Sequence, residues 1–448
     1  MGVPRREFDV VVAGGGPAGV AAAISAARAG AKVALVEGMG CFGGMATSGL
    51  VPVFNPFSNG KWPVVRGIGY EILMGLRKRG SALMKPDPLP RELPKYDWVS
   101  LDAEKLKLLL DELLVEAGVS ARLFTQVTEP VVKGDRITAV RTWSKSGEEE
   151  WVAPVYVDAT GDADVAARAG CPFEKGDANG LMQPSTVCFV MAGFKPGAGK
   201  FIRTKRLIRP ILQRASEEGK LTGKYDHHYC IDHKVPDYTA IGFNYKHQLD
   251  TDGNSAASLT QAIMEGRRMA HELCAFLRKN VKGCEKAFVT STAQLVGIRE
   301  TRRIVGEYRM DVDHFFAKKK SYDDIADYTN EIDVHVTGKT KADIKKRKFK
   351  EIDTFLPVGE YYGIPYRALI PKGVTNLLVA GRGISCDRKM HGSVRPMPAC
   401  FATGHAAGYA AKLASKCEGK VRDIDIRRLQ QGLIKQGAFI DLSGKGTK

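Results

Sequence analysis

Three adjacent glycines near the start of the chain constrain the fold more than any other feature. Residues 11–38 read VVAGGGPAGVAAAISAARAGAKVALVEG. The β-branched apolar run before the glycines predicts a buried strand over 8–13, and the small apolar residues after them predict a helix over 17–29. The glycines of this turn follow the GxGxxG order: Gly14, Gly16 and Gly19. Glycines at a strand-to-helix turn have one of two explanations: the tight turn itself leaves no space for side chains, or a ligand approaches the backbone closely there.

The residues that follow the turn favour the ligand. Pro17 suits the first helical turn, where its missing N–H would have no intrahelical partner. Free N–H groups and the helix dipole at that end attract phosphate. A second strand is predicted over 32–36, and it ends in Glu37, whose carboxylate is placed to accept hydrogen bonds from ribose hydroxyls. We therefore predict a dinucleotide site, with a purely structural turn as the alternative.

Composition and cysteine usage limit the class of protein. The chain has 448 residues, enough for two or three domains, and 44% of them are hydrophobic, as in an ordinary globular protein. The first predicted strand begins too early to leave room for a signal peptide, and no apolar run is long enough to span a bilayer. Nine cysteines without a CxxC pair argue against a disulfide framework, a zinc ribbon or an iron–sulfur cluster. We expect a cytoplasmic protein with reduced thiols and no metal site.

The positive charge of the chain raises the question of nucleic-acid binding. The net charge is +17, and two clusters, 200–214 and 341–350, each hold six cationic residues. Neither cluster is interleaved with stacking aromatic residues or lies in a recognisable nucleic-acid module. A solvated surface is favoured over an anion-attracting role, and no nucleic-acid partner is expected.

The nucleotide-binding pattern returns twice later in the chain. Residues 157–170 form a second predicted strand-to-helix turn, which places Ala159, Thr160 and Gly161 where a cofactor could lie. Residues 374–385 predict another strand, ending in Gly381 and Arg382, and a helix opened by Pro398 follows. Between them, an amphipathic helix over 258–280 stands among strand-like runs.

This arrangement predicts an α/β fold with an inserted α+β domain. We expect a Rossmann-like nucleotide-binding domain formed by 1–175 and 356–448, interrupted by a substrate domain over 176–355.

Several stretches, taken in order, resemble one family: VVAGGGPAGVAAAISAARAGAKVALVE, GGMATSGLV (43–51), VDATGDADVAARAG (157–170), GIRETRRIVGEY (297–308), YYGIPYRALIPKGVTNLLVAGR (361–382) and GSVRPMPACFATGHAAG (392–408). The chain resembles the bacterial FAD-dependent oxidoreductases of the glutathione-reductase-like superfamily, related to flavin subunits of the succinate dehydrogenase type. The resemblance covers nearly the whole chain and implies FAD as cofactor.

The resemblance also implies a role for individual residues of this sequence. Gly14, Gly16, Pro17, Ala18 and Gly19 would hold the pyrophosphate, Glu37 the adenosine ribose, and Val127 the adenine. Gly43, Gly44, Met45 and Thr47 would run beside the isoalloxazine, with Ala159, Thr160, Gly161 and Asp162 in the second cofactor motif. Gly381 and Arg382 would approach the ribityl and pyrophosphate portion, and Pro398 and Ala399 would open a helix toward flavin N1. A helix N-terminus there stabilises the negative charge that hydride transfer to N5 leaves near N1.

Candidate reacting groups lie in the predicted loop over 387–396. His391 has the intrinsic pKa of a base that takes a proton as hydride leaves, and Arg388 and Arg395 could orient a carboxylate or hydroxyl. A histidine satisfied by backbone is the alternative for His391. Residues 299–303, RETRR, are expected either near the flavin or in structural ion pairs. The succinate dehydrogenase type links its flavin through a histidine. Here the corresponding region has Cys41 instead, and inert packing is favoured over a cysteinyl link.

The resemblance implies a reaction type without naming the substrate. We expect hydride transfer between flavin N5 and a small polar metabolite, anionic on charge grounds, with an unknown electron acceptor. Two alternatives stay open: a flavin-binding protein with a non-redox or RNA-modifying role, and the flavin subunit of an electron-transfer complex. A homo-oligomer is also left open.

Overall fold

The computed structural model describes residues 3–81, 98–195, 197–222, 228–232, 240–335 and 354–443. The predicted basic cluster over 341–350 lies outside these described residues.

A five-stranded parallel sheet forms the centre of the molecule. Its strand order is β19-β10-β2-β3-β6, and each neighbouring pair runs parallel. The strands span Val10–Ala13 (β2), Val33–Val36 (β3), Ser120–Arg122 (β6), Val155–Asp158 (β10) and Leu377–Val379 (β19). Strands β2, β3, β10 and β19 are short, mostly apolar runs, because both faces of a parallel sheet are buried. The edge strand β6 is Ser-Ala-Arg and is exposed. The Rossmann-like α/β core predicted from the sequence is confirmed.

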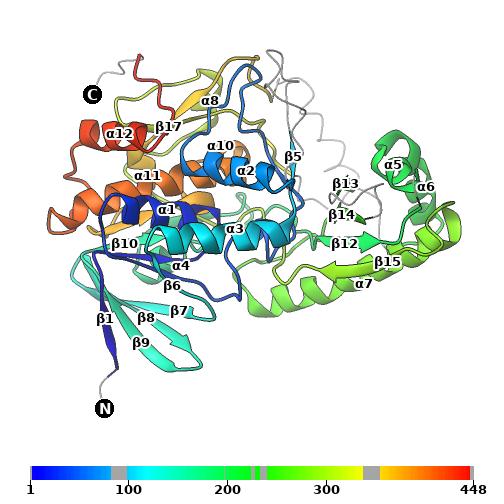
Figure 1. Ribbon diagram of the computed structural model, residues 1–448, viewed down its shortest axis with the longest axis horizontal. Helices are drawn as coiled ribbons and strands as arrows, with labels where there is room; N and C mark the ends of the chain where they lie inside the picture. The colour runs from blue at the N-terminus through cyan, green and yellow to red at the C-terminus, as the bar shows by residue number, and fades with distance from the viewer. Residues whose placement is uncertain are drawn as a thin grey trace.

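Helices cover one face of this sheet (Figure 1). They are α1 (Pro17–Arg28), α2 (Ile68–Lys78), α3 (Ala103–Glu116) and α11 (Met397–Ser415). Val10 and Val12 of β2 point into the core that these helices share, while Val11 and Ala13 point to the opposite face. The side-chain period of two along the strand produces this division. The helix predicted over 17–29 thus forms and ends within one residue of its predicted end.

A second sheet covers the other face. Its order is β1-β9-β8-β7, with strands Arg5–Glu7, Gly147–Val152, Arg136–Ser144 and Gln126–Lys133, and α4 (Asp164–Arg168) lies beside it. Ile137, Val140 and Trp151 of this sheet pack with Val11 in one buried cluster. The molecule therefore has a three-layer body, with the parallel sheet in the middle.

A smaller lobe projects from this body (Figure 1). It holds the antiparallel sheet β13-β14-β12-β15, with strands His228–Asp232, Ala240–Tyr245, Phe189–Ala192 and Phe288–Thr292. Helices α5 (Ala198–Arg203), α6 (Lys205–Glu217) and α7 (Ala256–Asn280) accompany the sheet. The basic cluster over 200–214 falls on α5 and α6, at the tip of the lobe. The lobe has its own hydrophobic core, to which Ala270, Leu273 and Leu277 of α7 contribute.

The remaining elements are short. Three two-stranded sheets pair β4 (Val53–Phe54) with β5 (Val99–Ser100), β11 (Phe173–Lys175) with β16 (Arg302–Ile304), and β17 (Asp324–Tyr328) with β18 (Tyr362–Pro365). Helices α8 (Val312–Phe316), α10 (Arg388–Val394) and α12 (Ile426–Lys435) and the 3-10 turns Gly44–Ala46, Tyr366–Leu369 and Gly381–Gly383 complete the fold. Phe315 and Tyr328 pack in the same core as α11. The boundaries at 175 and 355 remain predictions.

The prediction of a loop over 387–396 is wrong, because most of this segment forms helix α10. The Asp387 side chain caps this helix by accepting a hydrogen bond from the Met390 N–H (2.6 Å).

In the described part of the chain, no helix is both long and apolar enough to cross a bilayer.

Candidate active site

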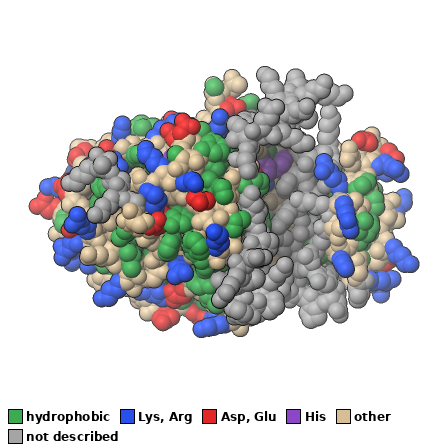
Figure 2. Space-filling view, turned by 90° about the horizontal axis from the view of Figure 1, so that it is seen from above, with side chains coloured by type: hydrophobic (Ala, Val, Ile, Leu, Met, Phe, Trp, Pro, Cys, Tyr) green, Lys and Arg blue, Asp and Glu red, His purple; other side chains and the backbone are tan. Residues whose placement is uncertain are grey.

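A cavity of about 870 Å³ opens at the carboxyl ends of four strands of the parallel sheet. The residues after β2, β3, β10 and β19 all contribute to its wall, and the lobe closes it from the other side. In open parallel sheets, ligands bind at this edge, where the strands end and the helices begin. Figure 2 shows histidine side chains in a hollow between the body and the lobe.

The glycine turn after β2 is shaped by two different requirements. A Cβ on Gly14 would lie 2.6 Å from the Ala159 carbonyl oxygen, and one on Gly19 would lie 1.7 Å from the Gly14 carbonyl oxygen, so both glycines are needed for packing. A Cβ on Gly16 would meet nothing within 4 Å, although this residue lines the cavity. Helix α1 begins directly after Gly16 without any side-chain cap. Its first N–H groups are therefore available to an anion.

Glu37 is held at the cavity wall by main-chain donors. Its carboxylate accepts hydrogen bonds from the Gly15 N–H (2.6 Å) and the Met39 N–H (2.8 Å). Each oxygen retains a further lone pair for a ligand hydroxyl. Gln126 and Val127, from the start of β7, line the same part of the cavity.

The loop after β3 returns to the glycine turn. The Gly43 N–H donates to the Gly15 carbonyl (2.8 Å), and the Thr47 hydroxyl donates to the Phe42 carbonyl (2.7 Å). Gly44 and Met45 line the cavity, whereas Gly43 and Thr47 support the loop from behind. Cys41 also lies off the wall, with its sulfur 3.2 Å from the Ser48 hydroxyl.

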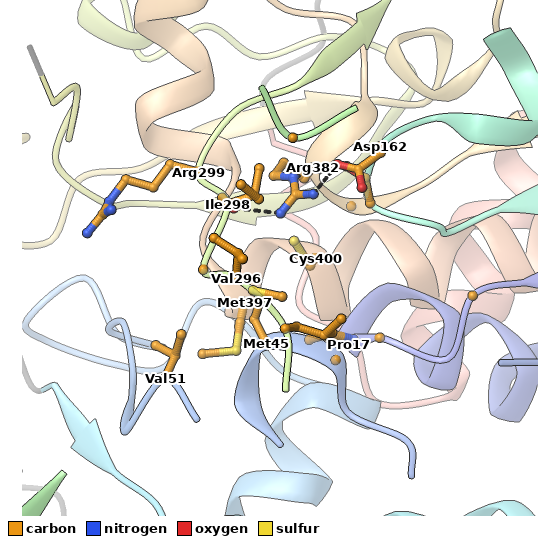
Figure 3. Close-up of a pocket in the computed structure, with 18 of the residues that line it drawn as sticks. Pro17, Met45, Val51, Asp162, Val296, Ile298, Arg299, Arg382, Met397 and Cys400 are labelled. Carbon is orange, nitrogen blue, oxygen red and sulfur yellow. Dashed lines mark hydrogen bonds and ion pairs between the residues drawn. The ribbon is translucent and has the colours of Figure 1, made fainter. Parts of the chain in front are cut away.

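Arg382 joins three parts of the wall. Its guanidinium donates to the carbonyls of Gly161 (2.9 Å) and Ile298 (2.6 Å) and forms an ion pair with Asp162. Thr301 adds a hydrogen bond to the same Asp162 oxygen (2.7 Å). The turn after β10 is thereby tied to the segment between β15 and β16 that carries Ile298 (Figure 3). Figure 3 also shows Met45, Val51, Val296 and Met397 grouped as an apolar part of the wall.

Helix α11 opens onto the cavity one residue earlier than predicted. Its N-terminal residue is Met397, the N-cap is Pro396, and no side chain caps it. Pro396, Met397 and Cys400 line the cavity, while Pro398 and Ala399 are buried in the helix and do not.

A charged cluster lies on the cavity wall. Arg395 donates to the Asp333 carboxylate (2.8 Å) and to the Asp333 carbonyl (2.9 Å), while Arg395 Nε has no partner among the described residues. His335 Nε2 lies 3.1 and 3.2 Å from the two Asp333 carboxylate oxygens. All three residues line the cavity, and so does Arg299.

Burial and neighbouring charges set the protonation of this cluster. Burial and the charge of Arg299 lower the pKa of His335 to about 4, and the Asp333 charge opposes them. Burial of Asp333 favours its protonated form, but His335 and Arg395 outweigh burial and hold the pKa of Asp333 well below its usual range. Asp333 is thus held as a carboxylate in an ion pair with Arg395.

The other two candidate reacting residues lie elsewhere. His391 is fully buried, its Nε2 faces the Arg382 carbonyl at 3.0 Å, and burial with the charges of Arg303 and Arg395 lowers its pKa. Arg388 pairs with the buried Glu300 (3.0 Å), which also pairs with Arg303 (2.5 Å). Neither His391 nor Arg388 is among the lining residues. Part of RETRR therefore forms structural ion pairs, one of the two alternatives for that stretch.

The cavity brings together most of the residues expected at the cofactor. The predicted residues that line it are Gly14, Gly16, Pro17, Ala18, Glu37, Gly44, Met45, Val127, Ala159, Thr160, Gly161, Asp162, Gly381, Arg382 and Arg395. The predicted residues that do not line it are Gly19, Gly43, Thr47, Arg388, His391, Pro398 and Ala399. Asp333, His335 and the segment 294–298 were missed, because only tertiary folding brings them to the sheet edge. Arg299 also lines the cavity, as one of the two alternatives for RETRR expected.

A family model described as "FAD dependent oxidoreductase" matches residues 9–433. The chain belongs to this family of FAD-dependent oxidoreductases. No curated protein matches it.

Solved structures resemble the chain at low sequence identity. A geranylgeranyl bacteriochlorophyll reductase-like protein from Thermoplasma acidophilum is 12% identical over 97% of this chain and 84% of its own, with a TM-score of 0.45. The p-nitrophenol 4-monooxygenase PnpA from Pseudomonas putida is 13% identical over 96% and 84%, with a TM-score of 0.47. The myxobacterial halogenase CndH is 14% identical over 96% and 78%, with a TM-score of 0.45. Similarity at this level identifies no substrate.

Proposed function

We propose that this FAD-dependent oxidoreductase transfers a hydride between a small polar, anionic metabolite and flavin N5. One observation carries the proposal: a single cavity runs from the glycine turn and Glu37 to the Arg395–Asp333–His335 cluster. The sheet edge that would bind the nucleotide and the charged cluster therefore line the same cavity. The metabolite and an unidentified electron acceptor are the proposed partners, and the proposed location is the cytoplasm.

The residues present fit FAD. The uncapped start of α1 and the open space over Gly16 suit a pyrophosphate, and Glu37 offers lone pairs to a ribose. The apolar group Met45, Val51, Val296 and Met397 suits an aromatic ring system, and the uncapped start of α11 offers N–H donors at that place. Bound FAD would supply a two-electron acceptor.

The protein's own residues bind the substrate, orient it and exclude water. Arg395 is fixed by Asp333, so its unpartnered Nε is a preorganised donor for an anionic or hydroxyl oxygen. Arg299 is held by the Pro184 carbonyl (2.8 Å) and the Thr186 hydroxyl (2.9 Å), and it adds positive charge to the wall. The Arg382 contact with Ile298 holds the segment between β15 and β16 over the apolar part of the cavity. Uncapped N–H groups of α11 would stabilise negative charge that develops beside them.

The test begins with a visible absorption spectrum of the purified protein, followed by anaerobic mixing with a metabolite library. The proposal expects a flavin spectrum and bleaching by at least one anionic metabolite. A protein without flavin would contradict it. Turnover with neutral sugars alone would contradict the anionic class. Bleaching only by a copurified protein that carries metal clusters would favour the electron-transfer alternative, and a shift of bulk tRNA at low salt would favour the RNA-modifying one.

A further inference from the structure

We propose that helix α7 forms a substrate subsite in the cavity, in which Leu259 and Ile263 bind an apolar chain or ring and Arg267 binds a carboxylate. This inference rests on the proposed function and deepens it, because it narrows the anionic metabolite to a carboxylate with an apolar portion. The subsite is separate from the residues that fit FAD, none of which lies on α7.

Helix α7 reaches from the body into the lobe, and its first half borders the cavity (Figure 1). Leu259, Ile263 and Arg267 of this half line the cavity, and their spacing of four residues places them in one row along the helix. Gly266 fixes the helix there, because a Cβ on this residue would lie 2.4 Å from the Val187 Cβ. The row is therefore presented to the cavity by a helix that is held in place.

The apolar part of this row continues the apolar wall of the cavity. Leu259 and Ile263 pack against the buried hydrophobic cluster that contains Val296. Val296 also belongs to the apolar group with Met45 and Met397, the group that suits the isoalloxazine ring (Figure 3). The α7 row and the proposed flavin position are thus joined by one apolar surface.

Leu259 and Ile263 leave part of their surface uncovered in the cavity. Both side chains are half-buried, although they pack against a hydrophobic cluster. Cys188 lines the same cavity, and burial raises the pKa of its thiol to about 12, so this group stays neutral. A hydrocarbon that covers such a surface gains about 0.8 kcal/mol per methylene, which is roughly a fourfold gain in affinity. The surface therefore favours a substrate with an apolar portion over a wholly polar one.

Arg267 supplies an uncompensated positive charge at the end of this row. The guanidinium has no hydrogen bond or ion pair with another described residue, and the side chain is exposed. The neighbouring carboxylates of the helix are engaged elsewhere, because Glu265 pairs with Arg268 (3.8 Å) and Glu272 accepts hydrogen bonds from Thr222 (2.8 Å). A guanidinium matches the two oxygens of a carboxylate. Because Arg267 is exposed, a carboxylate bound there keeps part of its hydration, and the cost of desolvation stays small.

Three other arginines of the described cavity wall already have partners. Arg382 and Arg395 each pair with an aspartate, and Arg299 donates to a carbonyl and a hydroxyl. A substrate carboxylate at any of these would compete with an existing contact. At Arg267 it displaces no protein group.

The test is isothermal titration calorimetry of the holoenzyme, with the straight-chain carboxylates butanoate, hexanoate and octanoate as probes. We expect the dissociation constant to fall about fourfold for each added methylene. Hexanamide has the length of hexanoate without its charge, and we expect it to bind at least about tenfold more weakly.

Two pairs of variants separate the apolar part from the charged part. Leu259→Ser should weaken octanoate about tenfold and butanoate little, because Leu259 lies about 12 Å from Arg267 along the helix axis. Met264→Ser is its control, since Met264 is exposed and off the cavity wall. Arg267→Gln should remove the preference for hexanoate over hexanamide, whereas Arg268→Gln, also off the wall, should keep it. If Leu259→Ser does not fold, Leu259→Thr takes its place with the same expectation.

The opposite results overturn the inference. A dissociation constant that does not change with chain length would contradict the apolar subsite. Equal affinities for hexanoate and hexanamide, or the same loss of preference in Arg267→Gln and Arg268→Gln, would contradict the role of Arg267. Failure of the proposed function is distinguishable from these results, because it is a purified protein whose visible spectrum shows no flavin. Failure of this inference is a flavin-loaded protein that does not discriminate among the probes.

Discussion

Gly404 of helix α11 packs directly on the backbone of Ala18 in helix α1. A Cβ on Gly404 would lie 2.1 Å from the Ala18 carbonyl oxygen, and one turn later a Cβ on Gly408 would lie 2.0 Å from the Ala22 carbonyl oxygen. The two helices can approach this closely only because these positions carry no side chain. Since both helices open onto the cavity, this contact sets the separation of the proposed pyrophosphate and flavin ends.

The first prediction concerns this contact. Gly404→Ala should force α1 and α11 apart and lower the free energy of unfolding by about 3 kcal/mol, through overpacking at backbone that cannot move aside. Thermal unfolding measures the loss, and flavin content should fall with it. Lys412→Ala, on a half-buried position of the same helix, is the control and should change stability little. A Gly404→Ala variant as stable as the parent protein would contradict the packing described.

Glu37 should affect cofactor affinity more than stability. Glu37→Gln replaces a charged acceptor held by two main-chain donors, and hydrogen bonds to charged groups contribute about 1.5–3 kcal/mol. We expect FAD to bind roughly ten- to a hundredfold more weakly, as measured by fluorescence titration of the apoprotein. Glu104→Gln, at an exposed helix position, should leave the affinity unchanged. Equal affinities for the two variants would refute the assignment of Glu37 to the ribose.

The Arg382–Asp162 pair should hold the cavity closed. Removing one partner of a poorly exposed ion pair leaves the other uncompensated, so Arg382→Ala should cost about 3 kcal/mol. The double variant Arg382→Ala, Asp162→Asn should cost less than the sum of the two single variants. Arg309→Ala removes an exposed pair with Glu174 and should cost at most about 1 kcal/mol. Strict additivity in chemical denaturation would show that the pair does not couple the two loops.

Asp324 should make stability depend on pH. Burial raises the pKa of Asp324 to about 7, with the charge of Lys320 opposing this effect and the charge of Asp327 adding to it. Its folded-state pKa lies above the unfolded value, so the folded protein binds the extra proton, and this contribution is lost as pH rises from about 4 to 7.

The variant Asp324→Asn tests this assignment, because the amide needs no proton. The difference in melting temperature, Asp324→Asn minus the parent protein, should become more positive between pH 5 and pH 8. Taking the difference cancels the contributions of the buried histidines, which titrate in both proteins. A difference that is constant with pH, or that decreases, would contradict the assignment.

Local patterns predicted the nucleotide-binding half of the site well. Gly14 and Gly16 follow β2 and Glu37 follows β3, and the carboxyl ends of parallel strands meet at one edge of the sheet whatever the rest of the chain does. The start of α11 was predicted one residue too late, at Pro398 instead of Met397, because both Pro396 and Pro398 are compatible with positions at a helix start. Asp387 was available in the sequence as a cap for α10, and this signal was missed.

The substrate-facing half could not be predicted in the same way. His335 and Asp333 come to the cavity through contacts with Arg395 and Gln183, which are 62 and 152 residues away in sequence. No local period or spacing encodes such contacts. His391 lies next to a recognisable motif in the sequence. In the folded chain, however, its ring is buried beneath α10 and contacts the Arg382 carbonyl. Only this burial, which no local pattern encodes, distinguishes it from His335.

The central claim is that main-chain amides at the glycine turn hold the diphosphate of FAD, and Gly16→Val tests it most directly. Gly16 has φ −70° and ψ −174°, which any residue adopts, and its Cβ would enter open space on the cavity wall, so the variant should fold normally. We predict that the Gly16→Val variant without flavin has the same melting temperature as the parent apoprotein. We also predict that it binds FAD at least about a hundredfold more weakly than the parent protein does. Gly30→Ala, at the other end of α1 with φ +89°, should show the reverse: some loss of stability and full flavin content. A Gly16→Val protein that retains its flavin would contradict the account.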